Sequence, residues 1–194
     1  MLNPRQALEA EAAKFRAWAD TQPIATRSGE WETNYLGWSE VYSAFEAYVQ
    51  TTGNQDWDAA ITVELLYLIA RDNEMQTLIE EIAKRPEDVL YLAKNAVSYP
   101  DYHAKWQLAV ELGELDAYKD AALKLLLLFA YDEDMYVRRR AMISLANLGS
   151  AQVEELAANA WKHGDENMAP QANMNECQRC IRSGKLARRN STPI

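Results

Sequence analysis

Residues 131–149 read YDEDMYVRRRAMISLANLG, and this stretch decides the fold class. An acidic turn at 132–134 precedes apolar residues that recur at steps of three or four positions, at Val137, Ala141, Leu145 and Leu148. This spacing places the apolar side chains on one face of a helix, and Gly149 is of the residue type that commonly ends helices. The stretch therefore predicts one amphipathic helix over 134–148.

Comparable apolar patterns recur along most of the chain and predict further helices. The expected helices cover 4–20, 38–50, 58–71, 74–84, 86–97, 102–112, 117–131, 153–162 and 173–182. The chain has only 7 Gly and 6 Pro, which is too few turn residues for a sheet of many short strands. We therefore expect an all-α fold, with residues 24–35 as a long connection.

Two segments of the chain align at a separation of 33 residues when Asp101 is placed over Asp134. Four apolar positions then coincide: Leu108 with Ala141, Val110 with Ile143, Leu112 with Leu145, and Leu115 with Leu148. One other expected helix, 117–131, lies between the two segments, so the repeating unit is a helix pair. A single pair cannot bury its apolar face alone, and stacking of such pairs produces an α-solenoid.

The quoted stretch resembles the HEAT repeat family, whose second helix combines Asp, Val-Arg, Ala, Leu and Leu-Gly at these intervals. The matching residues are Asp134, Val137, Arg138, Ala141, Leu145, Leu148 and Gly149. A second and more degenerate match contains Asp101, Lys105 and Leu112. The resemblance covers residues 98–165, and it extends to 58–184 by helix order alone.

The resemblance implies a right-handed α-α superhelix of HEAT-like helix pairs. The implied limits are 1–184 for a single solenoid domain, 1–54 for a divergent N-terminal helical cap, 58–184 for the repeats and 185–194 for a flexible basic tail. The resemblance also implies that Asp134 and Arg138 form hydrogen bonds between neighbouring repeats. At least one of Arg139 and Arg140 is then expected to face solvent.

Charge is distributed unevenly along the chain, whose formal net charge is -9. Residues 1–175 hold 15 Lys+Arg against 28 Asp+Glu, a balance of -13, whereas residues 176–194 hold 5 against 1, a balance of +4. An acidic body repels phosphate backbones, so we expect no nucleic acid on the main surface. It would attract a basic protein, although net charge can also serve solubility alone.

The residue types that carry most enzyme chemistry are sparse and lie outside known motifs. The two histidines are His103 and His163, and the two cysteines, Cys177 and Cys180, have no second Cys or His pair that would complete a metal site. His103 is expected at a surface or an interface. The sequence contains neither a phosphate loop nor a dinucleotide fingerprint. We therefore expect no catalytic activity, no cofactor and no metal.

The sequence predicts a cytoplasmic protein. Acidic residues occur within positions 1–15, where a signal peptide needs an apolar segment, and no stretch approaches the roughly 20 apolar residues of a membrane span. Two cysteines are compatible with a reducing compartment.

Aromatic residues are concentrated between positions 31 and 57, and Trp31 and Tyr35 lie in the expected long connection. Aromatic side chains with acidic neighbours can anchor a protein partner, or they can belong to the core. Both interpretations stay open at this point.

The acidic charge, the helix pairs and the lack of catalytic motifs favour a non-enzymatic scaffold that binds a basic protein. An immunity-type inhibitor that neutralises a basic toxin, such as a nuclease, would combine these properties. The expected contact residues are Trp31, Tyr35, Tyr102, Asp132, Glu133 and Arg139. One alternative is an enzyme or a small-ligand-binding HEAT-like protein with a pocket near the aromatic connection. Another is an assembly module that associates with itself.

Overall fold

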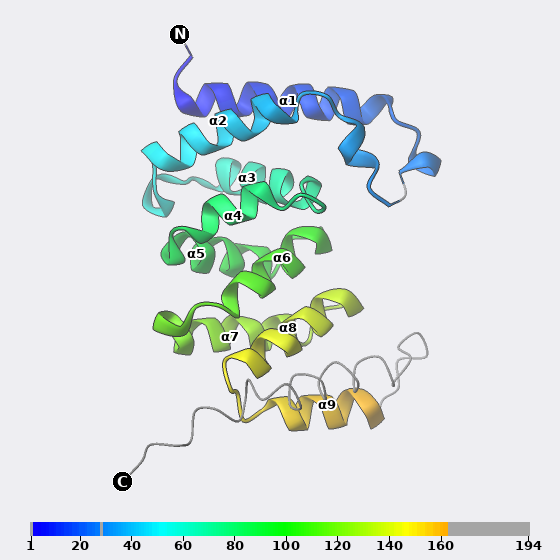
Figure 1. Cartoon of the computed structure of the whole chain (residues 1–194), viewed down its shortest axis with the longest axis vertical. Helices are drawn as coiled ribbons and strands as arrows, with labels where there is room; N and C mark the ends of the chain where they lie inside the picture. The colour runs from blue at the N-terminus through cyan, green and yellow to red at the C-terminus, as the bar shows by residue number, and fades with distance from the viewer. Residues whose placement is uncertain (1, 28, 163–194) are drawn as a thin grey trace. The chain divides into compact units, whose positions relative to one another are not determined.

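A computed structural model describes residues 2–27 and 29–162 of the chain (Figure 1). Within these ranges the regular structure is entirely helical, which confirms the predicted all-α class. The α-helices are α1 (Pro4–Thr21), α2 (Trp38–Thr51), α3 (Ala59–Arg71), α4 (Thr77–Ala83), α5 (Pro86–Ala96), α6 (Tyr102–Leu112), α7 (Lys119–Phe129), α8 (Met135–Asn147) and α9 (Val153–Lys162). Short 3-10 helices are η1 (Ile24–Thr26), η2 (Trp31–Asn34), η3 (Asn54–Asp56) and η4 (Asp116–Tyr118).

Local sequence signals explain where several helices begin. The Asn3 side chain accepts a hydrogen bond from the Gln6 N–H, and the Gln6 side chain accepts one from the Asn3 N–H, so a capping box opens α1. Asp58 caps α3 by accepting from the Ile61 N–H. Pro86 occupies the first turn of α5, where its missing N–H costs nothing. The predicted starts of these three helices are therefore correct to within one residue.

The α4 helix begins later than the predicted 74–84 segment because the chain first makes a turn after α3. Asp72 is buried in this turn, and its Oδ2 accepts a hydrogen bond from the Leu78 N–H at 2.8 Å. Gln76, directly before α4, has a φ of 58°, a left-handed conformation that few non-glycine residues adopt. A buried carboxylate and a left-handed residue thus set the start of α4.

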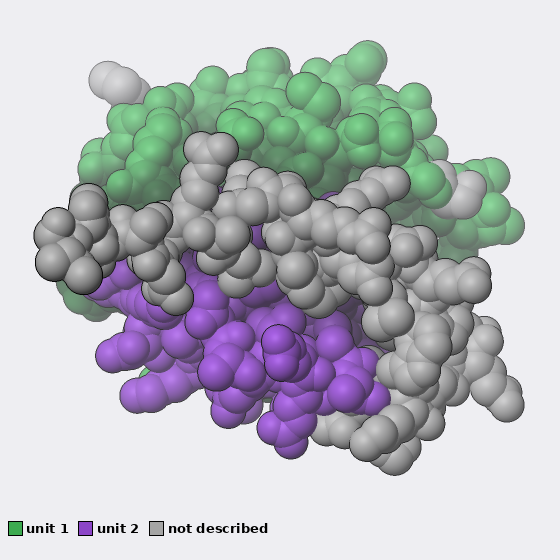
Figure 2. All heavy atoms as spheres, turned by 60° about the horizontal axis from the view of Figure 1, so that its bottom comes forward, with its two compact units in different colours: residues 1–107 green, residues 108–194 purple. Residues whose placement is uncertain are grey.

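The chain divides into two compact units, residues 1–107 and residues 108–194 (Figure 2). The boundary lies between Gln107 and Leu108, inside the continuous helix α6. We refer to these parts as the N-terminal unit and the C-terminal unit.

The N-terminal unit contains three consecutive helix pairs: α1 with α2, α3 with α4, and α5 with the start of α6 (Figure 1). Helix α1 packs against α2 and α3, α2 packs against α4, and α3 packs against α4 and α5. The connections within pairs, at 22–37, 72–76 and 97–101, lie at one edge of the unit, here called the first edge. The connections between pairs, at 52–58 and 84–85, lie at the opposite edge.

An aromatic cluster joins α1 to α2, α3 and the α1–α2 connection. Phe15 of α1 is fully buried, and its ring centroid lies 5.0 Å from that of Tyr35, 5.1 Å from Trp38 and 6.1 Å from Tyr67. The Trp18 ring lies 5.5 Å from Phe15 in a tilted arrangement. Aromatic pairs of this kind stabilise by about 0.5–1.5 kcal/mol each beyond the burial of area. The cluster therefore fixes the long connection to the helical core.

In the C-terminal unit, α8 packs against α7 and α9. The predicted apolar stripe of α8 is buried, at Val137, Ala141, Leu145 and Leu148. Gly149 adopts a φ of 66°, and the Ser150 N–H donates to the Leu145 carbonyl at 2.9 Å, a hydrogen bond that closes the helix end. The quoted stretch therefore forms the predicted helix with the predicted stop.

The leucine-rich helix α7 is covered less completely than its sequence indicates. Because Leu125 to Phe129 are all apolar, the sequence predicts cover on more than one side. Leu126 and Phe129 are buried, but Leu128 is 54% exposed. The run of leucines therefore includes one solvent-facing position.

Some sequence predictions fall outside the described residues. They concern His163, the expected helix 173–182 with Cys177 and Cys180, and the basic tail 185–194. Among the helices of residues 2–27 and 29–162, none has both the length and the apolar character needed to cross a membrane.

Replacing Asp134 with alanine is expected to lower the free energy of unfolding by about 1–2 kcal/mol. The Asp134 side chain accepts hydrogen bonds from the Tyr136 and Val137 N–H groups at 2.8 and 3.1 Å, and alanine cannot replace them. Asp134→Ser should keep most of the stability, because serine also caps helices. Urea denaturation measures both variants. Equal losses for alanine and serine would show that Asp134 stabilises by another contact, such as one to a neighbouring repeat.

Candidate binding site

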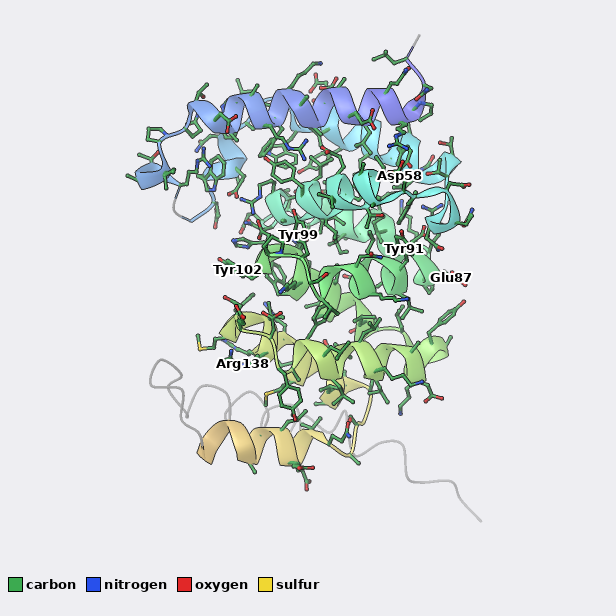
Figure 3. All side chains as sticks on the ribbon, turned by 180° about the vertical axis from the view of Figure 1, so that it is seen from behind. Asp58, Glu87, Tyr91, Tyr99, Tyr102 and Arg138 are labelled. Atoms are coloured by element: carbon green, nitrogen blue, oxygen red, sulfur yellow. The ribbon has the colours of Figure 1, made fainter. Side chains whose placement is uncertain are left out.

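An open pocket of about 650 Å³ lies at the first edge of the N-terminal unit. Its lining comes from the α1–α2 connection, the end of α3 and the start of α6. The lining residues are Arg27, Gly29, Trp31, Glu32, Arg71, Pro100, Asp101, Tyr102 and His103. Tyr99 and Tyr102 mark this edge in Figure 3, whereas Asp58, Glu87 and Tyr91 mark the opposite edge. We call this cavity the Arg71 pocket.

Arg71, the last residue of α3, pairs with two carboxylates in the pocket lining. Its Nη1 lies 3.2 Å from Oε1 of Glu32 in η2, and its Nη2 contacts Oδ2 of Asp101 directly before α6. The side chains of Arg71, Glu32 and Asp101, here called the Arg71 cluster, are only 16%, 4% and 24% exposed. One guanidinium therefore links a segment from each of the three helix pairs.

The α1–α2 connection is tied to α1 by Arg27 and Trp31. Arg27 donates from Nη2 to the Ala19 carbonyl at 2.6 Å and from Nε to the Gln22 carbonyl at 3.2 Å. A cation is favourable here because the carbonyls at a helix C-terminus carry partial negative charge. Trp31 stacks on Trp18 with ring centroids 5.5 Å apart, and the Arg27 guanidinium lies 5.1 Å from the Trp31 centroid. Structural contacts thus hold this wall of the pocket in place.

Tyr35 lies outside the pocket lining, is half-buried and packs against the core residue Phe15. Its ring meets Phe15 edge-on at 5.0 Å and also fills the space beside Gly37. A Cβ atom added to Gly37 would lie 2.7 Å from the Tyr35 ring, so glycine is needed for this close approach. Tyr35 therefore has a packing role against Phe15, and its role as a partner contact stays a prediction.

The start of α6 is organised in the same way as the start of α8. Asp101 Oδ1 accepts a hydrogen bond from the His103 N–H at 3.0 Å, and Asp134 Oδ1 accepts one from the Tyr136 N–H at 2.8 Å. These residues stand at the same positions of the 33-residue alignment. Asp101 thus serves both a helix start and the Arg71 cluster.

His103 is a half-buried residue of the pocket lining. Its Nδ1 lies 3.4 Å from the Trp106 indole nitrogen and 3.3 Å from Nδ2 of Asn73, and its ring centroid lies 3.9 Å from that of Tyr102. An indole N–H can only donate, so Nδ1 accepts from Trp106, and a neutral imidazole then carries its proton on Nε2. His103 is therefore an interface residue within the N-terminal unit, in agreement with the sequence prediction.

Two buried carboxylates at the first edge have raised pKa values. Burial raises the pKa of Glu32; its own backbone N–H and Arg71 oppose the rise, and Asp101 adds to it. Burial also raises the pKa of Asp72 to about 6. Hydrogen bonds from the Leu78 N–H and from the Tyr42 hydroxyl, 2.9 Å away, oppose that rise. This edge therefore contains acids that ionise less readily than exposed ones.

A second pocket, of about 530 Å³, lies at the opposite edge of the N-terminal unit. Arg85 donates to the Thr52 carbonyl at 2.7 Å and pairs with Asp88 at 2.7 Å. Asp88 Oδ1 accepts from the backbone and side-chain N–H groups of Asn54 at 3.0 and 2.8 Å. These contacts close the α2–α3 connection onto α5 and give structural roles to Arg85, Asp88 and Asn54.

The structure brings together two of the six expected contact residues, Trp31 and Tyr102, in the Arg71 pocket. Trp31 is half-buried, and Tyr102 is 39% exposed. Sequence reasoning missed Arg27 and the members of the Arg71 cluster. The available signal for Arg71 was a single basic residue at the end of a largely apolar helix.

The other expected contacts, Asp132, Glu133 and Arg139, belong to the C-terminal unit. Glu133 is exposed, and Asp132 and Arg139 are half-buried. Arg138 donates from Nη1 to the carbonyls of Asp132 and Glu133 at 2.9 and 2.7 Å. Because these hydrogen bonds are local to one helix start, the joining of neighbouring repeats by Asp134 and Arg138 stays a prediction.

Comparisons with protein-family models, with curated proteins and with solved structures find no significant match to this chain. The resemblance to the HEAT family therefore stays a prediction. Within the described part of the chain, no group of three or more His, Cys, Asp or Glu side chains is arranged to hold a metal ion.

Replacing Asp72 with asparagine is expected to change how stability depends on pH. Between the ordinary value of 3.8 and the folded value of about 6, the folded state holds a proton that the unfolded state has lost. The contribution of Asp72 to wild-type stability should therefore fall as pH rises through this window, by roughly 3 kcal/mol at most. Asp72→Asn should lack this decrease. Urea denaturation between pH 4 and 7 measures the difference.

Asp58→Asn provides a control of opposite sign for the Asp72 experiment. The hydrogen bond from Arg5 lowers the pKa of Asp58, so this carboxylate stabilises the folded state at neutral pH and loses that effect as pH falls. Parallel pH profiles for the wild type and Asp72→Asn would contradict the assignment of the raised pKa to Asp72.

Replacing Arg71 with alanine is expected to destabilise the protein by about 3 kcal/mol, because Glu32 and Asp101 would lose the cation with which they are paired. Arg5→Ala is the matched control. Arg5 also pairs with two acids, Glu9 and Asp58, but these side chains are 46% and 54% exposed, and solvent screens their attraction. Thermal and urea unfolding compare the two variants. If both variants lost the same free energy of unfolding, breaking the buried Arg71 cluster would cost no more than breaking the exposed Arg5 pairs.

Proposed function

We propose that this chain is a non-enzymatic protein-binding module and that the first edge of its N-terminal unit binds a basic partner protein. The observation that carries this proposal is the Arg71 pocket, where aromatic and acidic side chains of the first and third helix pairs meet Arg71 of the second pair at one edge. Aromatic side chains with a polar rim are the common anchors of protein interfaces.

The charge of the N-terminal unit supports a basic partner. Residues 1–107 hold 9 Lys+Arg against 17 Asp+Glu, so this unit has a balance of -8 and the rest of the chain has -1. Such a field accelerates association with a positively charged protein and repels nucleic acid. From this charge we infer that the chain is an immunity-type inhibitor and that its partner is a basic toxin, such as a nuclease.

The arrangement of the pocket carboxylates supports binding over catalysis. Glu32 and Asp101 both contact Arg71, and Asp101 also accepts the His103 N–H. Carboxylates held in ion pairs of this kind are poorly suited to take up and release protons during a reaction. We therefore keep the non-enzymatic interpretation in the proposal.

Repeat architecture forms the second part of the proposal. The shared Asp101 and Asp134 helix starts and the pairwise order of α1 to α6 support HEAT-like helix pairs. We infer that these pairs continue as a right-handed superhelix with a divergent N-terminal cap. A stack of this kind presents the connections within pairs along one edge, where a partner can contact several of them at once.

Small-ligand binding in the Arg71 pocket is the second candidate function. Its volume of about 650 Å³ lies within the usual range for such sites, roughly 300–1,000 Å³. The open and charged lining is less typical of these sites. Retention of a small molecule through purification under native conditions, detected by mass spectrometry of the denatured protein, would favour this alternative.

Charge reversal at the first edge tests the protein-binding proposal. Glu30, which is exposed beside the pocket lining, is replaced in Glu30→Lys; Glu46, exposed on α2, is replaced in the matched control Glu46→Lys. Both variants change the net charge equally. Partners captured from the native host by the wild type are identified, purified and titrated by calorimetry. We expect Glu30→Lys to weaken binding about tenfold and Glu46→Lys to change it much less.

Two results would contradict the proposal. Equal weakening by both variants would show that only the overall charge attracts the partner. Capture of nucleic acid alone, with no protein retained at physiological salt, would exclude the proposed partner class.

A further inference from the structure

One carboxylate of the Arg71 pocket has an unfilled capacity to accept hydrogen bonds. Glu32 has a side chain that is 4% exposed, and its Oε1 contacts Arg71. Its Oε2 is buried without a hydrogen bond of regular geometry, although the Trp31 indole lies near enough to favour the charged form slightly. Buried carboxylate oxygens are normally hydrogen-bonded, so this oxygen would be stabilised by a donor.

The two arginines of the pocket lining already donate to protein oxygens. Arg27 uses its guanidinium on the Ala19 and Gln22 carbonyls, and Arg71 directs its two Nη atoms to Glu32 and Asp101. Nε of Arg71 also lacks a hydrogen bond, but its guanidinium carbon lies 5.9 Å from the centroid of the Tyr67 ring. A ligand anion would therefore meet one buried donor without a hydrogen bond, Nε of Arg71, and a ligand cation would meet one such acceptor, Oε2 of Glu32.

The lining itself holds two arginines and two carboxylates, so the acidic and aromatic groups around it decide in favour of a cationic ligand. Glu30, next to the lining, and Glu74, on the α3–α4 turn, are both exposed acids at the first edge. Tyr102, at the rim, is 39% exposed, and aromatic rings attract cations. A charged N–H group also forms stronger hydrogen bonds to a carboxylate than a neutral amide does.

We propose that the Arg71 pocket receives an arginine or lysine side chain of the basic partner, with Oε2 of Glu32 accepting its charged N–H group. This inference rests on the proposed function, because the side chain belongs to the proposed partner. Oε2 is out of contact with solvent, so binding requires a small rotation of the Glu32 side chain toward the pocket. Arg71 keeps its contact with Asp101 during this rotation, so the unit stays closed.

Three small probes test the proposal on the wild-type chain: N-acetyl-arginine amide, N-acetyl-glutamine amide and N-acetyl-glutamate amide. They share a backbone and differ in side-chain charge. Titration is followed by the NMR signal of the Trp31 indole N–H, which is assigned with a Trp31→Phe variant. We expect saturable shifts with the arginine probe in the millimolar range and at least tenfold weaker binding of the other two. Stronger or equal binding of the glutamine or glutamate probe, or no binding of any probe, would overturn the proposal.

Variants then locate the binding group. Glu32→Gln should weaken binding of the arginine probe at least tenfold, whereas Glu46→Gln, the matched control on α2, should leave it unchanged. Circular dichroism and thermal unfolding establish that Glu32→Gln is folded under the conditions of the titration. If it is not folded, the comparison of the three probes on the wild type decides alone. Unchanged affinity in a folded Glu32→Gln would overturn the role of Glu32.

Failure of this inference and failure of the proposed function give different results. If a basic partner bound the wild type and Glu32→Gln equally, the protein-binding function would stand, but the Arg71 pocket would have no part in it. Binding of the arginine probe without any captured protein would leave a cation site and remove the partner.

Discussion

The N-terminal unit depends on one nearly buried guanidinium. Arg71 lies at the C-terminal end of α3, where the helix carbonyls favour a cation, and it contacts carboxylates from the segments before and after its own helix pair. Without it, an ionised Glu32 would be an unpaired buried charge, which costs several kcal/mol. Hydrophobic burial holds the helices together, and the Arg71 cluster determines which ends of the three pairs meet.

The same cluster gives the candidate site its rigidity. Glu32 is held by Arg71, and Trp31, the preceding residue, is stacked on Trp18, so the pocket wall forms before any partner arrives. Beyond the small rotation of the Glu32 side chain, binding then requires little ordering of the protein, which leaves more of the interaction energy for affinity. The long α1–α2 connection therefore presents a fixed surface.

Helix periods and caps could be predicted from the sequence because they depend on neighbours in the chain. Asp58, Pro86 and Gly149 act where their local signals indicate. The Arg71 cluster could not be predicted, because its members lie far apart in the sequence and each, taken alone, resembles an ordinary surface charge. The division into two units falls within α6, where no turn residue marks it in the sequence.

Opening of the α1–α2 connection can be measured by proteolysis at Arg27. A trypsin-like protease must draw the arginine side chain into its own pocket, but the Arg27 guanidinium is engaged by the Ala19 and Gln22 carbonyls and lies over the Trp31 ring. Cleavage after Arg27 therefore requires this part of the chain to leave α1 first. The rate of that single cut would report how often the wall of the Arg71 pocket opens in the folded protein.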